Sequence, residues 1–287
     1  MFAAKYRLES RADVAATFSP IPGTAHLTFA HSGSATVLVR AFATSPAKLI
    51  ATKARSTTCW VYAATLGGGL VGGDTIQLTV EVAPVARALL TTQASTKVYR
   101  SLRPSKQTIT ASVEAGGLLA VVPDPIVCFA DADFTQRQRY DLHADASLVV
   151  VDWMSSGRHA AGERWAFRKY DSRLDIRRNG QPVLFDAIVL EEQLDSIGDR
   201  MGRFESLLTA VVSGPLVSAA VDEILGRTSQ QPISGRADLV VSAARLRDGG
   251  LLLRAASTSV EQLGRALREL LAFLSPLVGD DLWSRKW

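Results

Sequence analysis

The sequence predicts a mainly β protein that ends in a small helical part. Through the first two-thirds of the chain, polar and apolar residues alternate in short runs, and a period of two is the signature of half-buried strands. Gly, Pro or Asp separates these runs, which recur at spacings of roughly ten residues. Helical periodicity appears only in the last third. Many strands followed by a few helices favour a mainly β architecture over an alternating α/β one.

The strand with the clearest pattern is Thr75–Val82, where apolar and polar residues alternate without interruption. Similar strands are predicted at Ala35–Ala41, Thr57–Ala64, Ala86–Thr92, Gln107–Val113, Leu118–Val122, Arg137–Leu142 and Leu148–Trp153. A hairpin is predicted between Leu174 and Val189, because Asn179-Gly180 separates two strand-like arms. Asn-Gly accepts the positive φ angles of a type I′ turn.

Two helices are predicted near the C-terminus. Leu216–Leu225 has apolar residues at helical spacing. The second helix, Ser259–Leu274, carries leucines on one face, and Thr258 with Glu261 forms a capping box before it. We expect Pro276 to end this helix. Two strand-like segments lie between the helices, at Asp238–Ala243 and Leu251–Ala255.

Composition excludes several classes of protein. The 287 residues include 32 Lys+Arg against 28 Asp+Glu, and a net charge of +4 argues against a nucleic-acid binder or a polybasic membrane binder. The chain has no apolar stretch of eighteen residues, so no membrane span is expected. Cys59 and Cys128 lack CxxC spacing, which argues against a disulfide framework or a structural zinc site. The first ten residues, MFAAKYRLES, contain no apolar core of a secretory signal, so we expect a cytoplasmic protein.

The glycine-rich segment Leu66–Asp74 contains a formal GxGxxG at Gly67, Gly69 and Gly72. A dinucleotide site needs this loop to lead from a strand into a helix whose N-terminus faces the pyrophosphate. Here the predicted strand Thr75–Val82 follows instead. We therefore interpret the loop as a tight connection between two strands. The alternative left open is a β-rich enzyme that binds a phosphate or nucleotide on this loop.

Other catalytic patterns are missing from the sequence. It has no HExxH and no G-x-S-x-G, and its four histidines are scattered. Two segments are unusually polar for a chain of this kind, Thr91–Ser101 and Ser155–Trp165. Such segments suit an ordinary hydrogen-bonded loop, a partner surface or a polar interior passage. Residue patterns alone thus indicate a soluble β-rich protein without a recognisable catalytic residue.

A family resemblance lies in these same segments. The matching stretches are Gly68–Asp74 (GGLVGGD), Leu89–Ser101 (LLTTQASTKVYRS), Pro123–Phe129 (PDPIVCF), Ser156-Gly-Arg158 and Gly162–Trp165 (GERW). In sequence, order and spacing they resemble the urease accessory protein UreD family, called UreH in some species. The resemblance extends over roughly residues 66–189 and is weaker on either side.

The resemblance implies a nickel-insertion chaperone of urea metabolism that is not an enzyme. It implies binding to UreF and, together with the GTPase UreG, an activation complex on apo-urease. Nickel would be carried transiently, with no tightly bound cofactor. The implied fold is a β-helix-like stack of sheets with a small α-helical C-terminal part, as a single UreD-like domain over residues 1–287. A scaffold in the same complex that never touches nickel remains an alternative.

Three carboxylates in the matching segments are candidate ligands for nickel in transit: Asp74, Asp124 and Glu163. A borderline divalent ion that must be released needs oxygen or nitrogen ligands, because thiolates would retain it. We expect these carboxylates to line a polar interior passage. The alternative is structural. Asp74 and Asp124 would then hydrogen-bond backbone amides in their turns, and Glu163 would pair with Arg158 or Arg164.

Overall fold

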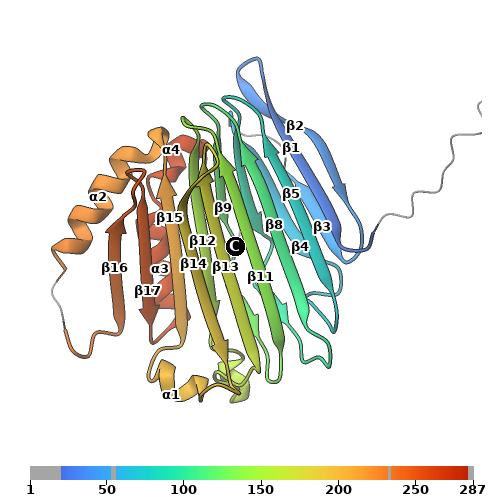
Figure 1. Cartoon of the computed structure of the whole chain (residues 1–287), viewed down its shortest axis with the longest axis vertical. Helices are drawn as coiled ribbons and strands as arrows, with labels where there is room; N and C mark the ends of the chain where they lie inside the picture. The colour runs from blue at the N-terminus through green and yellow to red at the C-terminus, as the bar shows by residue number, and fades with distance from the viewer. Residues whose placement is uncertain (1–20, 53–55, 232–233, 284–287) are drawn as a thin grey trace, which may run out of the picture.

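The computed structural model describes residues 21–52, 56–231 and 234–283, so the N-terminal segment MFAAKYRLES lies outside the described residues. Strands account for 49% of the structure and helices for 15%, which confirms the predicted fold class. The strands form two large sheets stacked face to face, and most of the helices cover one side of the stack (Figure 1).

One sheet has seven strands in the order β14-β13-β11-β8-β5-β1-β2. Its five central strands run parallel to one another, and β2 and β14 are antiparallel strands at its two edges. The bounds are β1 Thr24–Ser32, β2 Ala35–Ala43, β5 Thr75–Val82, β8 Ser105–Val113, β11 Asp133–Leu142, β13 Lys169–Arg178 and β14 Gln181–Glu191.

The other sheet has ten strands, eight of them in the order β16-β17-β15-β12-β9-β6-β4-β3. The short strands β7 and β10 pair with each other, and β10 also pairs with β12. The bounds are β3 Ala47–Ala51, β4 Cys59–Thr65, β6 Arg87–Thr92, β7 Thr96–Val98, β9 Leu118–Val122, β10 Ile126–Cys128, β12 Ser147–Ser155, β15 Ser206–Ser213, β16 Leu239–Arg245 and β17 Leu251–Ser257.

The chain winds between the two sheets from β4 to β13. It runs from β4 in the ten-stranded sheet to β5 in the seven-stranded sheet, and it repeats this step from β6 to β8, β9 to β11 and β12 to β13. Successive turns pair in parallel in both sheets. This is the β-helix-like stack that the family resemblance implied. Every connection into the seven-stranded sheet therefore lies at the same end of the stack, the end where α1 lies (Figure 1).

Two apolar cores hold the layers together. The first fills the space between the sheets and includes Leu27, Val61 and Phe134. The second packs the outer face of the ten-stranded sheet against the C-terminal helices and includes Leu263 and Leu274. The helices are α1 Ile197–Met201, α2 Ser218–Ser229, α3 Val260–Leu270 and α4 Leu274–Val278, with short 3-10 turns at His159–Ala161 and Pro215–Val217. Among the described residues, none of these helices has the length and apolar character that crossing a membrane requires.

The predicted strands and hairpin are confirmed. Strands β5 and β9 have the predicted bounds, and the others differ by a few residues at their ends. In the hairpin, β13 and β14 are antiparallel and Arg178 lies opposite Gln181. Asn179 and Gly180 both have positive φ angles, 49° and 74°, as a type I′ turn requires.

The predicted ends of the last helix are wrong by a few residues. The N-cap is Ser259, whose hydroxyl accepts a hydrogen bond from the backbone amide of Gln262 at 3.3 Å, and not Thr258. The α3 helix already ends at Leu270, and Pro276 lies inside the first turn of α4. Proline is tolerated there because a first-turn amide has no intrahelical acceptor.

Candidate functional site

A cavity of about 170 Å³ lies between the two sheets. Strands β4, β6, β9 and β12 border it from the ten-stranded sheet, and β5, β8 and β11 border it from the seven-stranded sheet. A single water molecule needs only about 10–15 Å³ measured in this way, so the space holds several. Much of its lining is polar, which is unusual for the interior of a two-sheet stack.

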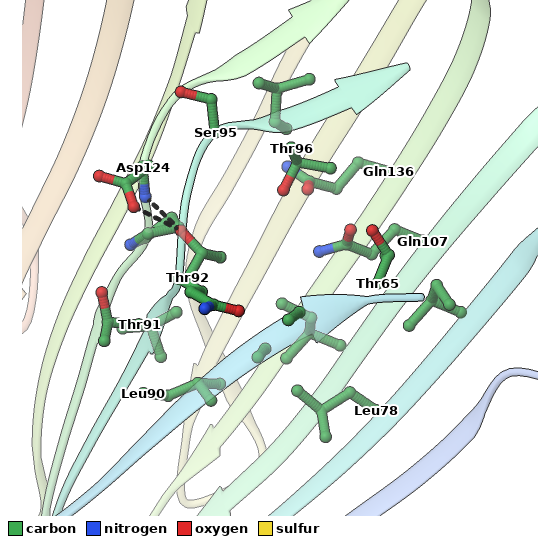
Figure 2. A pocket seen from close by; sticks show the side chains of 18 of the residues that line it. Thr65, Leu78, Leu90, Thr91, Thr92, Ser95, Thr96, Gln107, Asp124 and Gln136 are labelled. Atoms are coloured by element: carbon green, nitrogen blue, oxygen red, sulfur yellow. Dashed lines mark hydrogen bonds between the residues drawn. The ribbon is translucent and has the colours of Figure 1, made fainter. Parts of the chain in front are cut away.

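A row of polar side chains crosses the seven-stranded sheet on its inner face. Gln107, Gln136 and Ser172 occupy matched positions on three neighbouring strands, β8, β11 and β13. The amide nitrogen of Gln136 donates a 3.0 Å hydrogen bond to the Ser172 hydroxyl. In Figure 2 the amides of Gln107 and Gln136 lie near each other among the residues that line the cavity. The amide and hydroxyl oxygens of these groups could bind a passing cation.

Asp152 on β12 faces this row from the opposite sheet. Its carboxylate accepts hydrogen bonds from the Ser172 hydroxyl at 2.6 Å and from the Tyr170 hydroxyl at 3.3 Å. The residue is only 7% exposed, and within the described residues no cation pairs with it. Burial raises the pKa of Asp152, and the nearby Asp186 carboxylate acts in the same direction, although the hydrogen bonds oppose the shift.

Asp124 lines the same cavity just after β9. Its carboxylate accepts a 3.0 Å hydrogen bond from the Thr92 hydroxyl, and its backbone amide donates a 2.7 Å hydrogen bond to the Thr92 hydroxyl oxygen. Figure 2 shows this pair on the side of the cavity away from Gln107. Asp124 is therefore the member of the predicted carboxylate set that the structure places at the cavity.

Asp74 closes the glycine-rich loop. Its carboxylate accepts a 2.9 Å hydrogen bond from the backbone amide of Val71, and β5 begins at the next residue. The loop packs so tightly that a Cβ on Gly69 would lie 2.6 Å from the Tyr99 ring and 2.7 Å from the Lys97 carbonyl oxygen. The interpretation as a tight connection between strands is therefore confirmed. The loop leads into a strand, so it lacks the helix N-terminus that a dinucleotide site needs.

Glu163 lies in an open hollow together with Tyr99 and Phe129. The hollow is at the end of the stack where the chain enters the seven-stranded sheet, which we call the loop end. Arg158 binds the carboxylate with two nitrogens and also lies over the Phe129 ring, 4.3 Å from its centroid. The amide of Ala130 adds a 3.1 Å hydrogen bond. The hydrogen bond from Arg158 lowers the pKa of Glu163, so the group stays ionised.

The three predicted carboxylates do not converge on one point. Asp124 lines the cavity, Glu163 lines the hollow, and Asp74 lines neither. Within the described ranges, no three His, Cys, Asp or Glu side chains lie close enough to share a metal ion. The two cysteines, Cys59 and Cys128, are free and buried.

A polar interior passage was predicted, but Asp152 and Gln136, which contribute to the polar interior of the structure, were not among the predicted residues. A signal for each was present. Asp152 is a lone carboxylate in the apolar run Leu148–Met154, and Gln136 and Gln138 occupy positions of β11 that alternation assigns to the core. A buried polar side chain needs a partner, so such interruptions point to an interior polar network.

The fold and the cavity define a class of protein: a two-sheet, β-helix-like stack with a polar interior. The family model of the UreD urease accessory protein matches residues 22–287. The chain is 48% identical over 265 residues to the urease accessory protein UreD of Sorangium cellulosum, covering 92% of this chain and 84% of that protein. It is 34% identical over 302 residues to urease accessory protein D of Oryza sativa subsp. japonica, covering 95% and 98%.

The chain belongs to the UreD urease accessory protein family. A third relative, the urease accessory protein UreD of an Anaeromyxobacter species, is 41% identical over 265 residues, covering 92% of this chain and 89% of that protein. These relatives are named accessory proteins, and the role of this chain is likewise that of a urease accessory protein and not an enzyme.

Proposed function

We propose that the protein is a chaperone that delivers nickel to apo-urease in the cytoplasm, and that it works with UreF and the GTPase UreG. The ion passes through the polar space between the two sheets and is not retained there. The observation that supports this proposal most directly is the cavity, because carboxylate, amide and hydroxyl groups are among its lining, including Asp124 and the buried Asp152.

The chemistry of the lining suits an ion that must be released. Nickel accepts carboxylate, amide and hydroxyl oxygens, and several thiolates or imidazoles held together would bind it far more tightly. Asp124 and Asp152 supply one carboxylate each, and Gln107, Gln136 and Thr92 supply neutral oxygens. Because the ligands of such a passage are weak and separated, the nickel ion meets only a low barrier when it leaves each position. Asp74 and Glu163 remain in the proposal as ligands at the loop end of the stack.

The partners in the proposal divide the work. In the proposal this chain binds UreF, the GTPase UreG joins them in an activation complex, and apo-urease receives the ion. The names of the relatives support a role in urease maturation. A protein that acts through a complex should present apolar residues to its partners. Leu66, Val71 and Leu102 at the loop end of the stack are 50%, 52% and 96% exposed.

The test measures urease activation and complex assembly in parallel. Asp124→Asn and Asp152→Asn keep the shape of the cavity but remove its charge, and the triple variant Asp74→Ala, Asp124→Ala, Glu163→Ala removes the whole predicted set. Asp145→Asn, in an exposed loop at the opposite end of the stack, is the matched control. We expect the cavity variants to lower nickel content and activity of urease at least about tenfold, with UreF binding intact.

Each outcome has a clear meaning. Full activation by Asp124→Asn, by Asp152→Asn and by the triple variant would contradict nickel transit through this space. Activation lost together with UreF binding would indicate a structural role for the residues. To separate the scaffold alternative, nickel binding is measured on the isolated chain and on its UreF complex. A scaffold that never touches nickel would bind none in either state.

A further inference from the structure

Several of the motif segments that the cavity does not explain meet on one surface. They are the glycine-rich loop at residues 66–74 and the segments 97–103, 129–131 and 157–163, and we call this surface the loop-end face. The backbone amide of Leu70 donates to the Lys97 carbonyl at 2.8 Å, and that of Tyr99 donates to the Leu70 carbonyl at 2.9 Å. The face lies at the end of the stack where α1 lies (Figure 1).

The centre of the loop-end face is a hollow with aromatic walls. Tyr99 and Phe129 meet edge to face with their centroids 4.9 Å apart, and Arg158 lies over the second ring. Arg158 is fixed by its two bonds to Glu163. An aromatic hollow held rigid in this way suits an inserted apolar side chain, because little conformational entropy is lost when it fills.

The rim of the loop-end face carries excess positive charge. Among the described residues, Lys97 and Arg103 have no acidic partner within ion-pair distance. Arg100 is 78% exposed and pairs only loosely with Asp131 at 3.5 Å, a pair that an incoming carboxylate could replace at little cost. Between these cations Leu102 is 96% exposed at the tip of its loop. A cationic rim around apolar groups is complementary to an acidic partner that carries an apolar side chain.

We propose that the loop-end face docks an acidic segment of a partner protein, with one apolar side chain of that segment seated in the Tyr99–Phe129 hollow. The inference rests on the proposed function, in which UreF is the direct partner and therefore the probe. Acidic side chains of the segment pair with Arg100 and Arg103, and Leu102 packs against its apolar surface. The glycine-rich loop supports this face: side chains at Gly69 or Gly72 would displace the Tyr99–Arg103 segment.

The charge of the face argues against a resident metal ion as its occupant, as distinct from an ion that only passes Glu163 in transit. The arginine and lysine side chains repel a divalent cation. Of the two carboxylates that line the hollow, Glu163 already binds Arg158 and the Ala130 amide, and Asp131 lies 3.5 Å from Arg100. A small anion would leave Leu102 exposed to water. A protein segment satisfies both the cations and the apolar groups.

The experiment measures the affinity of the full-length chain for purified UreF at low and high salt, about 50 and 300 mM. The variants are Leu102→Asp and the pair Arg100→Glu, Arg103→Glu. Matched controls place the same kinds of change elsewhere on the surface: Val39→Asp on β2, where Val39 is 64% exposed, and Arg227→Glu on α2. Unchanged circular dichroism and melting temperature confirm that each variant is folded.

We expect each loop-end variant to weaken UreF binding at least about tenfold, and both controls to bind like the unmodified chain. Binding by the unmodified chain should weaken as salt rises, and binding by the arginine variant should lose that dependence. Arg100→Lys, which keeps the charge, should retain most of the affinity. If the loop-end variants are folded and bind UreF normally, the proposed docking face is wrong, and the partnership with UreF still stands. An unmodified chain that binds no UreF would overturn the partnership in the proposed function and the docking face with it.

Discussion

Ser172 on β13 donates a 2.6 Å hydrogen bond to the Asp152 carboxylate on β12, joining the two sheets through the interior of the stack. Gln136 donates in turn to Ser172, so a chain of polar groups connects neighbouring strands to a buried acid. Hydrogen bonds of this kind offset part of the cost of burying the carboxylate. They also fix its position at the wall of the cavity.

Replacing Asp152 by Asn should stabilise the protein at neutral pH. Burial raises the pKa of this carboxyl in the folded state, so the folded state holds the proton more tightly than the unfolded state. The contribution of Asp152 to the free energy of unfolding is therefore most favourable below the ordinary aspartate pKa of about 3.9, and it is lost as the pH rises through the folded value. Asn does not ionise and avoids that loss.

Denaturant unfolding at pH 4.5 and pH 7.5 checks this prediction. The advantage of Asp152→Asn should be larger at pH 7.5 and should shrink at pH 4.5. Asp145→Asn, in an exposed loop, is the matched control. An advantage of equal size at both pH values would mean that burial does not raise the pKa of Asp152 in the folded state.

Gly69→Ala should destabilise the fold by about 1–3 kcal/mol, because the new Cβ overlaps the Tyr99 ring and a backbone carbonyl. Gly226→Ala is the matched control. It lies in α2 with no atom within 4 Å of the added carbon, and it should raise stability by up to about 1 kcal/mol. Melting temperatures that shift in opposite directions would support both assignments. An unchanged Gly69→Ala variant would show that the loop tolerates a side chain.

Ser259→Ala should cost about 1 kcal/mol, since it removes the hydroxyl that caps α3. Thr258→Ala should change stability by less than about 0.5 kcal/mol, because Thr258 does not cap the helix. Urea unfolding distinguishes the two. A larger loss for Thr258→Ala would restore the capping box that the sequence alone predicts.

The isolated chain should be poorly soluble, and co-expression with UreF should raise its soluble yield several-fold. Exposed apolar residues such as Leu66, Val71 and Leu102 promote association when no partner covers them. Leu102→Ser should raise the soluble yield of the chain expressed alone. The soluble fraction on a gel and size-exclusion chromatography provide the measurement. A lone chain that is soluble, monodisperse and indifferent to UreF would contradict this dependence.

The sequence predicted the elements well and their assembly less well. Alternation located β5 to the residue, because neighbouring residues of a half-buried strand point to opposite faces of the sheet. The predicted bounds of β9 are also correct, although this strand, LLAVV, is buried on both faces and has no alternation. The end of α3 was misplaced because tertiary packing, and not local preference, decides where its last turn stops: Leu271 and Leu274 are both buried against the second core. Helix ends depend on contacts that no local pattern encodes.

The local sequence determined the strands, the Asn179-Gly180 hairpin and the tight glycine loop. Alternation, turn geometry and positive φ angles all depend on residues that are adjacent in the chain. Motif order also determined the family. Only the tertiary structure decided that Asp124 faces a cavity while Glu163 faces a separate hollow, and that Asp152 meets Ser172. Those contacts depend on how successive turns of the stack align and on how the two sheets face each other. That alignment follows from the packing of the whole interior, and no single segment contains it.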